Sequence, residues 1–149
     1  PNLTSVVFWA SEVYLDPSEG WLKRVERLYA NKSRIHGIKD FSDMSNLRTL
    51  VFSFSGFAEF PQNMESLGCL SELTLGDYSK GLVDLAEIDL SSFPCLKKLE
   101  LHAWYDTMTG IPKGLGKTGL TTLKIYHQQL TEEEKETIEV STEKMGILD

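Results

Sequence analysis

The chain has 149 residues, enough for one domain with a sizeable core and too few for two comfortable ones. Hydrophobic residues make up 41% of it and charged residues 25%, as in ordinary folded proteins, so the composition argues against disorder. The net charge of −7 argues against a nucleic-acid partner, and no stretch approaches the roughly 18 apolar residues of a membrane helix. We therefore expect a folded domain whose partner is neither a nucleic acid nor a membrane.

A short apolar pattern, Leu-x-x-Leu-x-Leu, recurs along the chain at nearly constant spacing. Its copies begin at residues 3, 25, 47, 70, 96 and 120, so the successive steps are 22, 22, 23, 26 and 24 residues. Because side chains alternate along a strand, the apolar residues of each copy point inward and the residues between them point outward. One copy cannot bury its apolar side alone, so the spacing predicts six stacked strands in a parallel sheet over a continuous core.

The first three copies also continue in phase beyond their strands. Ser11-Glu-Val13, Ser33-Arg-Ile35 and Ser55-Gly-Phe57 place a small polar residue and then an apolar one at the same two offsets. Residues 18–28 have apolar side chains at helical spacing, which is compatible with one helix over the whole segment. We favour a helix to about Arg24 followed by the second strand of the sheet.

The two cysteines, Cys69 and Cys95, stand immediately before the fourth and fifth copies. Two cysteines are too few for a disulfide framework, or for a tetrahedral metal site without other ligands. Their equivalent positions place them close together, and we expect a buried pair of thiols rather than a disulfide in a cytosolic protein.

The last segment, residues 131–149, differs from the rest of the chain in charge. It carries seven acidic side chains and two lysines, and so contributes −5 of the net charge of −7. Thr131-Glu-Glu-Glu134 has the sequence of a capping box, and acids in a first turn suit the helix dipole. We expect a helix from about Glu132, with Ile138 and Met145 turned inward, that closes the last repeat.

Over essentially its whole length, the chain resembles the leucine-rich-repeat family, whose repeats span about 20–29 residues. The resemblance implies an α/β solenoid of about six repeats over residues 1–130, followed by an acidic capping segment over residues 131–149. The parallel sheet would form the concave face, with short helices or turns on the convex face. The variable repeat lengths, the Cys-Leu starts and the phrases Glu59-Phe60-Pro61 and Gly110-Ile111-Pro112 look most like plant intracellular immune receptors.

In such disease-resistance receptors a nucleotide-binding module precedes the repeats, which recognise a pathogen effector or a guarded host protein. The resemblance therefore implies a cytoplasmic protein-binding module of plant defense, with an effector, a host client or another domain of the parent chain as its partner. The start of the chain, PNLTSVVFWASE, lacks the basic region of a signal peptide. It also lacks a cap over the first repeat, so we expect a piece of a larger protein or a covered first strand.

Two other binding roles stay open. A substrate adaptor or scaffold of the ubiquitin-ligase type would be indicated by an F-box motif in the parent chain. A receptor ectodomain would be indicated by glycans on Asn2 or Asn31, each of which begins a glycosylation triplet.

Catalysis is not expected. The sequence has no G-x-S-x-G, no G-x-x-x-x-G-K-[ST] and no H-E-x-x-H, and its paired acids lie in expected turns, where they commonly stabilise the backbone. We expect no cofactor. His102 and His127, with only Glu100 nearby, are a poor metal-ligand set, so we expect no metal either.

The outward positions of the strands predict the partner-binding residues of the concave face. Aromatic and aliphatic side chains on adjacent repeats form a stripe of the kind found in binding hot spots: Trp9, Tyr29, Val51 and Phe54. Later repeats contribute a mixed patch that selects a partner by complementary charge: Glu72, Asp77, Lys98, Glu100, His102, Lys124, Tyr126 and His127. The competing interpretations are that irregular repeats bury Trp9 or Phe54 in the core, and that the charged patch is only a solvated face.

Overall fold

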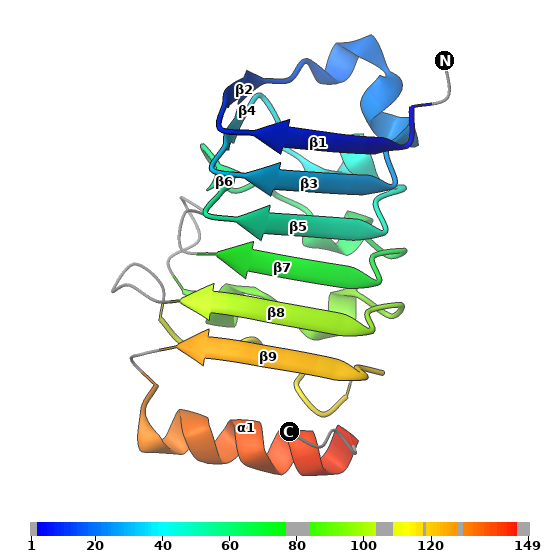
Figure 1. Ribbon diagram of the computed structural model, residues 1–149. Coiled ribbons are helices and arrows are strands. Elements are labelled where there is room, and N and C mark those ends of the chain that lie inside the picture. Colours follow the sequence, from blue (N-terminus) through cyan, green and yellow to red (C-terminus); the bar gives the residue numbers. More distant parts are fainter. Residues whose placement is uncertain (1–2, 77–83, 104–108, 118, 128–129, 146–149) are drawn as a thin grey trace.

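Six parallel strands form the main sheet of the protein (Figure 1). The structure, a computed structural model, describes residues 3–76, 84–103, 109–117, 119–127 and 130–145. In spatial order, the strands are β1 (Ser5–Trp9), β3 (Arg27–Asn31), β5 (Thr49–Ser53), β7 (Glu72–Gly76), β8 (Lys98–Ala103) and β9 (Thr122–His127). The fold is therefore α/β, with a parallel sheet and one α-helix near the C-terminal end.

The pairing register of these strands is the one that the sequence spacing predicts. Val6 pairs with Leu28, and the row continues through Leu50, Leu73, Leu99 and Leu123. The prediction of six parallel strands is confirmed. So is the favoured interpretation of residues 18–28, because the chain leaves a short 3-10 helix at Arg24 and begins β3 at Arg27.

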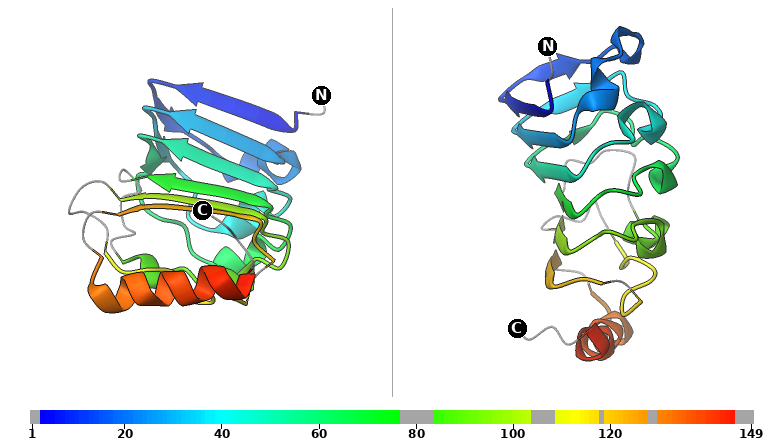
Figure 2. Two further views of the ribbon diagram at one scale, coloured as in Figure 1. Left: turned by 60° about the horizontal axis from the view of Figure 1, so that its bottom comes forward. Right: turned by 90° about the vertical axis from the view of Figure 1, so that its right-hand side faces the viewer.

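A second, smaller parallel sheet follows the first three strands of the main sheet. It consists of β2 (Glu12–Tyr14), β4 (Arg34–His36) and β6 (Gly56–Phe57). The edge-on view in Figure 2 shows short helices on the side away from the main sheet. These are the 3-10 helices η1 (Pro17–Glu19), η2 (Trp21–Arg24), η3 (Phe41–Met44), η4 (Met64–Ser66), η5 (Leu85–Glu87) and η6 (Leu90–Ser92).

The core consists of the inward side chains of the strands and the apolar residues of the 3-10 helices. Four rings, of Phe41, Phe52, Phe57 and Phe60, meet edge to face with centroids 4.9 to 6.0 Å apart. Such aromatic pairs add roughly 0.5–1.5 kcal/mol each beyond the area that they bury. Phe41 belongs to the second repeat and the other three rings to the third, so the rings join these two repeats.

Aspartates begin four of the 3-10 helices. Asp16, Asp40, Asp84 and Asp89 each accept a hydrogen bond from the backbone N–H two residues later, at 2.8 to 3.0 Å. The pKa of Asp16 and that of Asp89 lie below the ordinary value. The larger cause is the hydrogen bond from the hydroxyl of the serine two residues later, and the next is the bond from that serine's backbone N–H. These acids stabilise turns, as the sequence predicts.

A ladder of serines holds the bend between the two sheets. The Ser33 N–H donates to the Ser55 hydroxyl at 2.9 Å, and the Ser11 N–H donates to the Ser33 hydroxyl at 3.3 Å. Each hydroxyl also donates to the carbonyl two residues earlier. The residues that precede the serines are Ala10, Lys32 and Phe54, and all three have a left-handed backbone, with φ between 48° and 50°. Tyr78, Trp104 and Gln128, the later equivalents of these serines, lie outside the described residues.

The α-helix α1 (Glu132–Met145) lies beyond β9, across the end of the main sheet (Figures 1 and 2). Its capping box is formed as predicted: the Glu134 N–H donates to Thr131 Oγ1 at 3.2 Å, and the Thr131 N–H donates to Glu134 Oε2 at 2.8 Å. Ile138 is half-buried, whereas the side chain of Met145 lies outside the described residues.

The prediction of a buried thiol pair is wrong. Cys69 and Cys95 are both free and both exposed. Each precedes the first leucine of its repeat, and Leu70 and Leu96 are the residues that become fully buried. The cysteine side chains therefore remain outside the core.

Candidate functional site

The main sheet turns one side to the core and the other to solvent, and we call the solvent side, which Figure 1 looks onto, the open sheet face. Its residues are the outward positions of the strands and Phe54, which follows β5. These residues are Ser5, Val7, Trp9, Arg27, Tyr29, Asn31, Thr49, Val51, Ser53, Phe54, Glu72, Thr74, Gly76, Lys98, Glu100, His102, Thr122, Lys124 and Tyr126.

Apolar side chains occupy the N-terminal half of the open sheet face. Val7 and Trp9 are both 66% exposed and Phe54 is 60% exposed, so neither Trp9 nor Phe54 lies in the core. Tyr29 and Val51 are half-buried and follow Val7 in one row across adjacent strands. Seven large hydrophobic side chains are exposed among the described residues; Val7, Trp9 and Phe54 lie in this half, and Tyr126 lies at the other end of the same face. Four of the seven therefore share the open sheet face.

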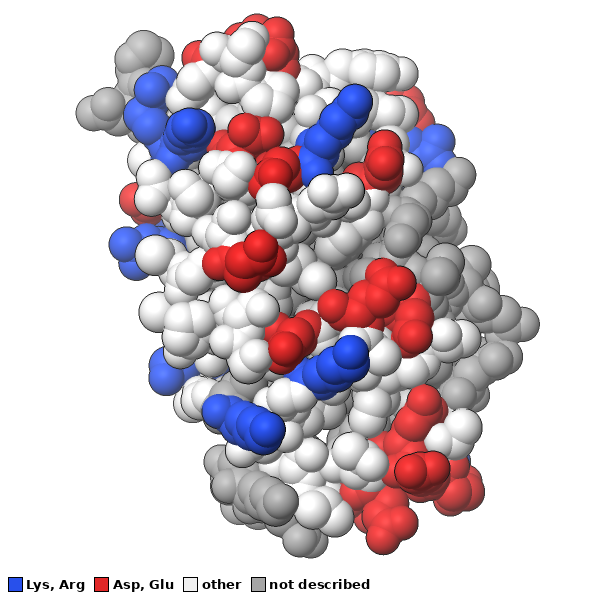
Figure 3. Space-filling model, turned by 180° about the vertical axis from the view of Figure 1, so that it is seen from behind, with Lys and Arg blue, Asp and Glu red and all other residues white. Residues whose placement is uncertain are grey.

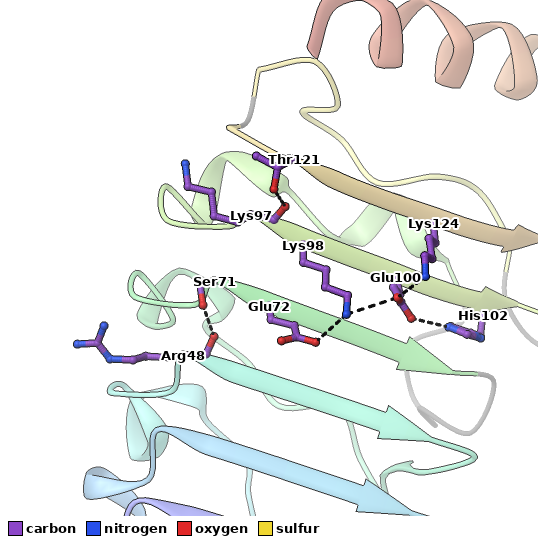
Figure 4. Close-up of polar contacts among 9 residues, drawn as sticks. All are labelled: Arg48, Ser71, Glu72, Lys97, Lys98, Glu100, His102, Thr121 and Lys124. Carbon is purple, nitrogen blue, oxygen red and sulfur yellow. Dashed lines mark hydrogen bonds and ion pairs between the residues drawn. The ribbon is translucent and has the colours of Figure 1, made fainter. Parts of the chain in front are cut away.

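Charged side chains occupy the C-terminal half, around Glu100 (Figure 4). The carboxylate of Glu100 lies 3.3 Å from His102 Nε2, 3.4 Å from Lys124 Nζ and 3.7 Å from Lys98 Nζ. Lys98 reaches the other way as well, to Glu72 at 3.2 Å. These residues come from β7, β8 and β9, and the parallel register places them side by side. The patch is a connected network, not a set of separate solvated charges.

Glu100 stays ionised although its side chain is only 16% exposed. Burial alone would raise the pKa of Glu100, but hydrogen bonds from His102 and Lys124 and the charges of Lys98 and Lys124 outweigh it, so the pKa lies below its ordinary value. The hydrogen bond to Glu72, together with that carboxylate's charge, raises the pKa of Lys98. These contacts favour the charged forms of Glu100 and Lys98.

A hollow of about 210 Å³ separates the two halves of the face. Gly76 forms part of its lining and stands in one row with the neighbouring His102, so the missing side chain leaves space between β5 and β8. Phe54 and Val51 line the apolar side of the hollow, and Glu100 and His102 line the charged side. A side chain of a partner that entered it would contact both kinds of surface.

The structure brings most of the residues predicted for binding onto one face. Tyr126 stacks at a tilt against His102, with ring centroids 4.9 Å apart. Asp77 and the side chain of His127 lie outside the described residues. The predicted proximity of His102 and His127 therefore also falls outside them. The alternation of the strands places Val7 and Gly76 at outward positions, but the sequence did not single out either one as a binding residue. Val7 is exposed beside Trp9, and no sequence pattern marks Gly76 as the lining of a hollow.

The opposite side of the molecule has a different character. Figure 3 shows acidic and basic side chains interspersed over it, with acids gathered at the end that holds α1. The first turn of that helix carries Glu132, Glu133 and Glu134. In the described ranges no helix is long and apolar enough to cross a membrane. In those same ranges, no three His, Cys, Asp or Glu side chains cluster so as to hold a metal ion.

Compared with protein-family models, curated proteins and solved structures, the chain matches none of them.

Proposed function

We propose that this chain is a leucine-rich-repeat solenoid segment that recognises another protein through its open sheet face. The in-register strands at steps of 22 to 26 residues support the solenoid assignment. So does the serine ladder, which occupies the position where such repeats usually carry asparagine. The resemblance to plant intracellular immune receptors favours a cytoplasmic role in defense, with a pathogen effector or a host protein as partner.

One observation carries the binding proposal: four of the seven large hydrophobic side chains exposed in the described ranges lie on the open sheet face. Trp9 and Phe54 are aromatic, and aromatic side chains beside polar ones are typical of interface hot spots. Fully burying a side chain such as Phe54 contributes roughly 1.5–3 kcal/mol. Trp9 is 66% exposed and Phe54 60% exposed, so a partner that covers both rings gains roughly 2–4 kcal/mol before the cost of association, against the about 8 kcal/mol of micromolar binding.

The Glu100 network supplies selectivity to the same face. Its side chains are already held by one another, so a partner meets fixed charges and loses little side-chain entropy on ordering them. A partner with misplaced charges must break ion pairs without replacing them, which excludes it.

The glycan test of a receptor ectodomain stays an experiment. Asn31 is half-buried at the end of β3, between Trp9 and Ser53 at outward positions of the neighbouring strands, and Asn2 lies outside the described residues. A ubiquitin-ligase adaptor would use the same face to bind a client protein. The identity of the captured partner therefore distinguishes the adaptor from the immune receptor.

The test is capture of a partner from plant cell extract by the whole chain and by three variants. Trp9→Ala/Phe54→Ala removes the two exposed rings, and Gly76→Ala places a methyl group in the hollow. The Cβ of that alanine would approach Phe52 O and Phe54 N no closer than 3.6 and 3.8 Å, which is ordinary contact. Tyr14→Ala is the matched control, because Tyr14 is 76% exposed but belongs to the smaller sheet.

We expect the same protein to be captured by the parent chain and by Tyr14→Ala, and to be lost or weakened with the other two variants. Circular dichroism must first show that all four proteins are equally folded. Equal capture by the parent and by Trp9→Ala/Phe54→Ala would rule out the open sheet face as the binding surface. An effector or guarded protein among the captured partners supports a defense receptor, and a ubiquitin-ligase client supports the adaptor.

A further inference from the structure

A second, larger hollow lies at the bend between the two sheets, beside the open sheet face. Its volume is about 610 Å³, and it runs across the first three repeats. Four of its eight lining residues are small: Ala10, Ser11, Ser33 and Gly56. Gly56 pairs directly with Arg34 on the neighbouring strand, so the third repeat has no side chain beside the Arg34 guanidinium. Small side chains at these four positions leave room for the hollow.

Two cations line the hollow, Lys32 and Arg34. Neither forms an ion pair with any of the described residues. Glu12 also borders the hollow and stands opposite Arg34 in the register, but its carboxylate is held by His36 Nε2 at 2.6 Å. The local charge is therefore positive in a chain whose net charge is −7.

The backbone and the serine hydroxyls of the bend are already engaged. The N–H groups of Lys32, Ser33 and Arg34 donate to Ser53 O at 3.0 Å, to Ser55 Oγ at 2.9 Å and to Ser11 O at 3.0 Å. The hydroxyls of the lining serines are used by the ladder. Recognition in this hollow therefore falls to the charged side chains and to Phe54.

The bend also fixes where one of these cations stands. Lys32 adopts φ 50°, a left-handed conformation that a residue with a side chain adopts only at a free-energy cost. Its N–H bond to the third repeat holds that conformation in place. The base of the Lys32 side chain is thus set by the backbone, next to Phe54 of the following repeat, which lines the same hollow.

Phe54 lines both hollows, the one at the bend and the one at Gly76. A chain segment that leaves the open sheet face over Phe54 enters the hollow at the bend. We propose that this hollow, which we call the cationic bend site, binds an oxyanion-bearing side chain of the protein partner, with Lys32 and Arg34 as its ligands and Phe54 against its apolar part. That the oxyanion belongs to a protein partner rests on the proposed function, whereas the affinity of the site for an anion does not.

Small aromatic anions test the site directly on the whole chain. The probes are phenyl phosphate and benzoate, which separate a phosphate from a carboxylate source, and benzylamine is the cationic control of similar shape. Backbone amide shifts in a two-dimensional NMR titration report the place of binding. We expect saturable shifts around Ala10, Lys32 and Gly56 with at least one anion and none with benzylamine. The stronger anion identifies the oxyanion of the partner.

Charge variants then assign the ligands. Removing both charge-assisted contacts in Lys32→Gln/Arg34→Gln should weaken anion binding by about tenfold or more. Arg48→Gln, which removes an exposed cation before β5 (Figure 4), should leave it unchanged, and Glu12→Gln should strengthen it. Added salt should weaken binding in the parent chain by screening and competition.

Two results would overturn the proposal: no saturable shift at the bend with either anion up to ~10 mM, or equal binding by the parent chain and Lys32→Gln/Arg34→Gln. The probe experiment needs no protein partner, so its outcome is separate from the capture experiment. If capture depends on Trp9 and Phe54 but no anion binds at the bend, the cationic bend site alone is refuted. If anions bind at the bend but Trp9→Ala/Phe54→Ala captures the partner as well as the parent chain does, the proposed function alone is refuted.

Discussion

The three serines of the ladder should contribute different amounts to the free energy of unfolding, and Ser55→Ala should cause the largest loss. Ser55 is fully buried, and its hydroxyl accepts the Ser33 N–H at 2.9 Å while donating to Ser53 O at 2.8 Å. Alanine removes both bonds. The Ser53 carbonyl still accepts from the Lys32 N–H at 3.0 Å. The Ser33 N–H is therefore the one buried group that the substitution leaves without a hydrogen-bond partner. A buried donor without a partner costs about 1–3 kcal/mol, and we expect Ser55→Ala to lower the free energy of unfolding by that amount.

Ser11→Ala is the matched control for this substitution. Ser11 begins the same ladder and donates the same kind of bond, to Trp9 O at 2.7 Å, but it is exposed, and no backbone N–H of an earlier repeat donates to its hydroxyl in the described chain. Water replaces the lost bond there, so we expect a loss of no more than about 0.5 kcal/mol. Ser33→Ala should fall between the two, because the N–H that it leaves belongs to exposed Ser11.

Urea unfolding, followed by far-ultraviolet circular dichroism, measures the free energy of unfolding of the three variants. All curves are fitted with one shared slope of free energy against urea concentration. The order of losses should be Ser55, then Ser33, then Ser11. Equal losses at Ser55 and Ser11 would refute the reasoning, because they would mean that the hydroxyl of Ser55 does not satisfy a buried donor.

Three further predictions follow from the same contacts. Leu73→Ala should lower the free energy of unfolding by roughly 2–5 kcal/mol, because Leu73 is 3% exposed in the central row of the core; in a urea titration, a loss well under ~1 kcal/mol would contradict the strand register. Ala10→Gly should raise the free energy of unfolding by up to about 1 kcal/mol, because φ of Ala10 is 48°, a left-handed conformation that glycine adopts at less cost. Ala30→Gly in β3 should lower it by at least ~0.5 kcal/mol. A loss in both variants in the same assay would count against the left-handed bend. The pKa of Glu100 in the folded protein lies below its value of 4.5 in an unfolded chain, so its contribution to stability is present above pH 4.5 and is lost as the pH falls through the folded pKa. Glu100→Gln should therefore be less stable near neutral pH and should lose less stability on acidification, and unchanged acid unfolding curves would contradict the network.

The sequence predicted the main sheet well because each step of that prediction rested on local alternation. Six copies of one apolar pattern fix both the inward residues and the register, since a strand of the wrong register would expose its leucines. Thr131 and Glu134 predicted the start of α1 for a similar reason, because a capping box needs only residues within one turn. Both features are encoded over a few neighbouring positions.

The features that the sequence did not predict depend on side chains from different repeats. Gly76 lines a hollow only because His102 and the residues of β5 stand beside it. The two cysteines looked equivalent to buried positions, yet the burial boundary falls one residue later in each repeat. Arg34 gains its role from the absence of a side chain at Gly56, and a missing neighbour leaves no pattern in a single sequence.

The serine ladder also has a direction, and this bears on how the protein opens. The N–H of the first repeat is held by a hydroxyl of the second, and the N–H of the second by a hydroxyl of the third. Loss of the first repeat would therefore leave the ladder N–H groups of the other two repeats paired, whereas loss of the third repeat would break the bond that holds the second. Ser11 is also exposed and Ser33 is buried, so the amide of Ser11 should exchange its hydrogen far sooner than that of Ser33. Because Trp9 ends the strand that leads to Ser11, a partner that covers its ring should slow exchange of the Ser11 amide more than exchange of the Ser33 amide.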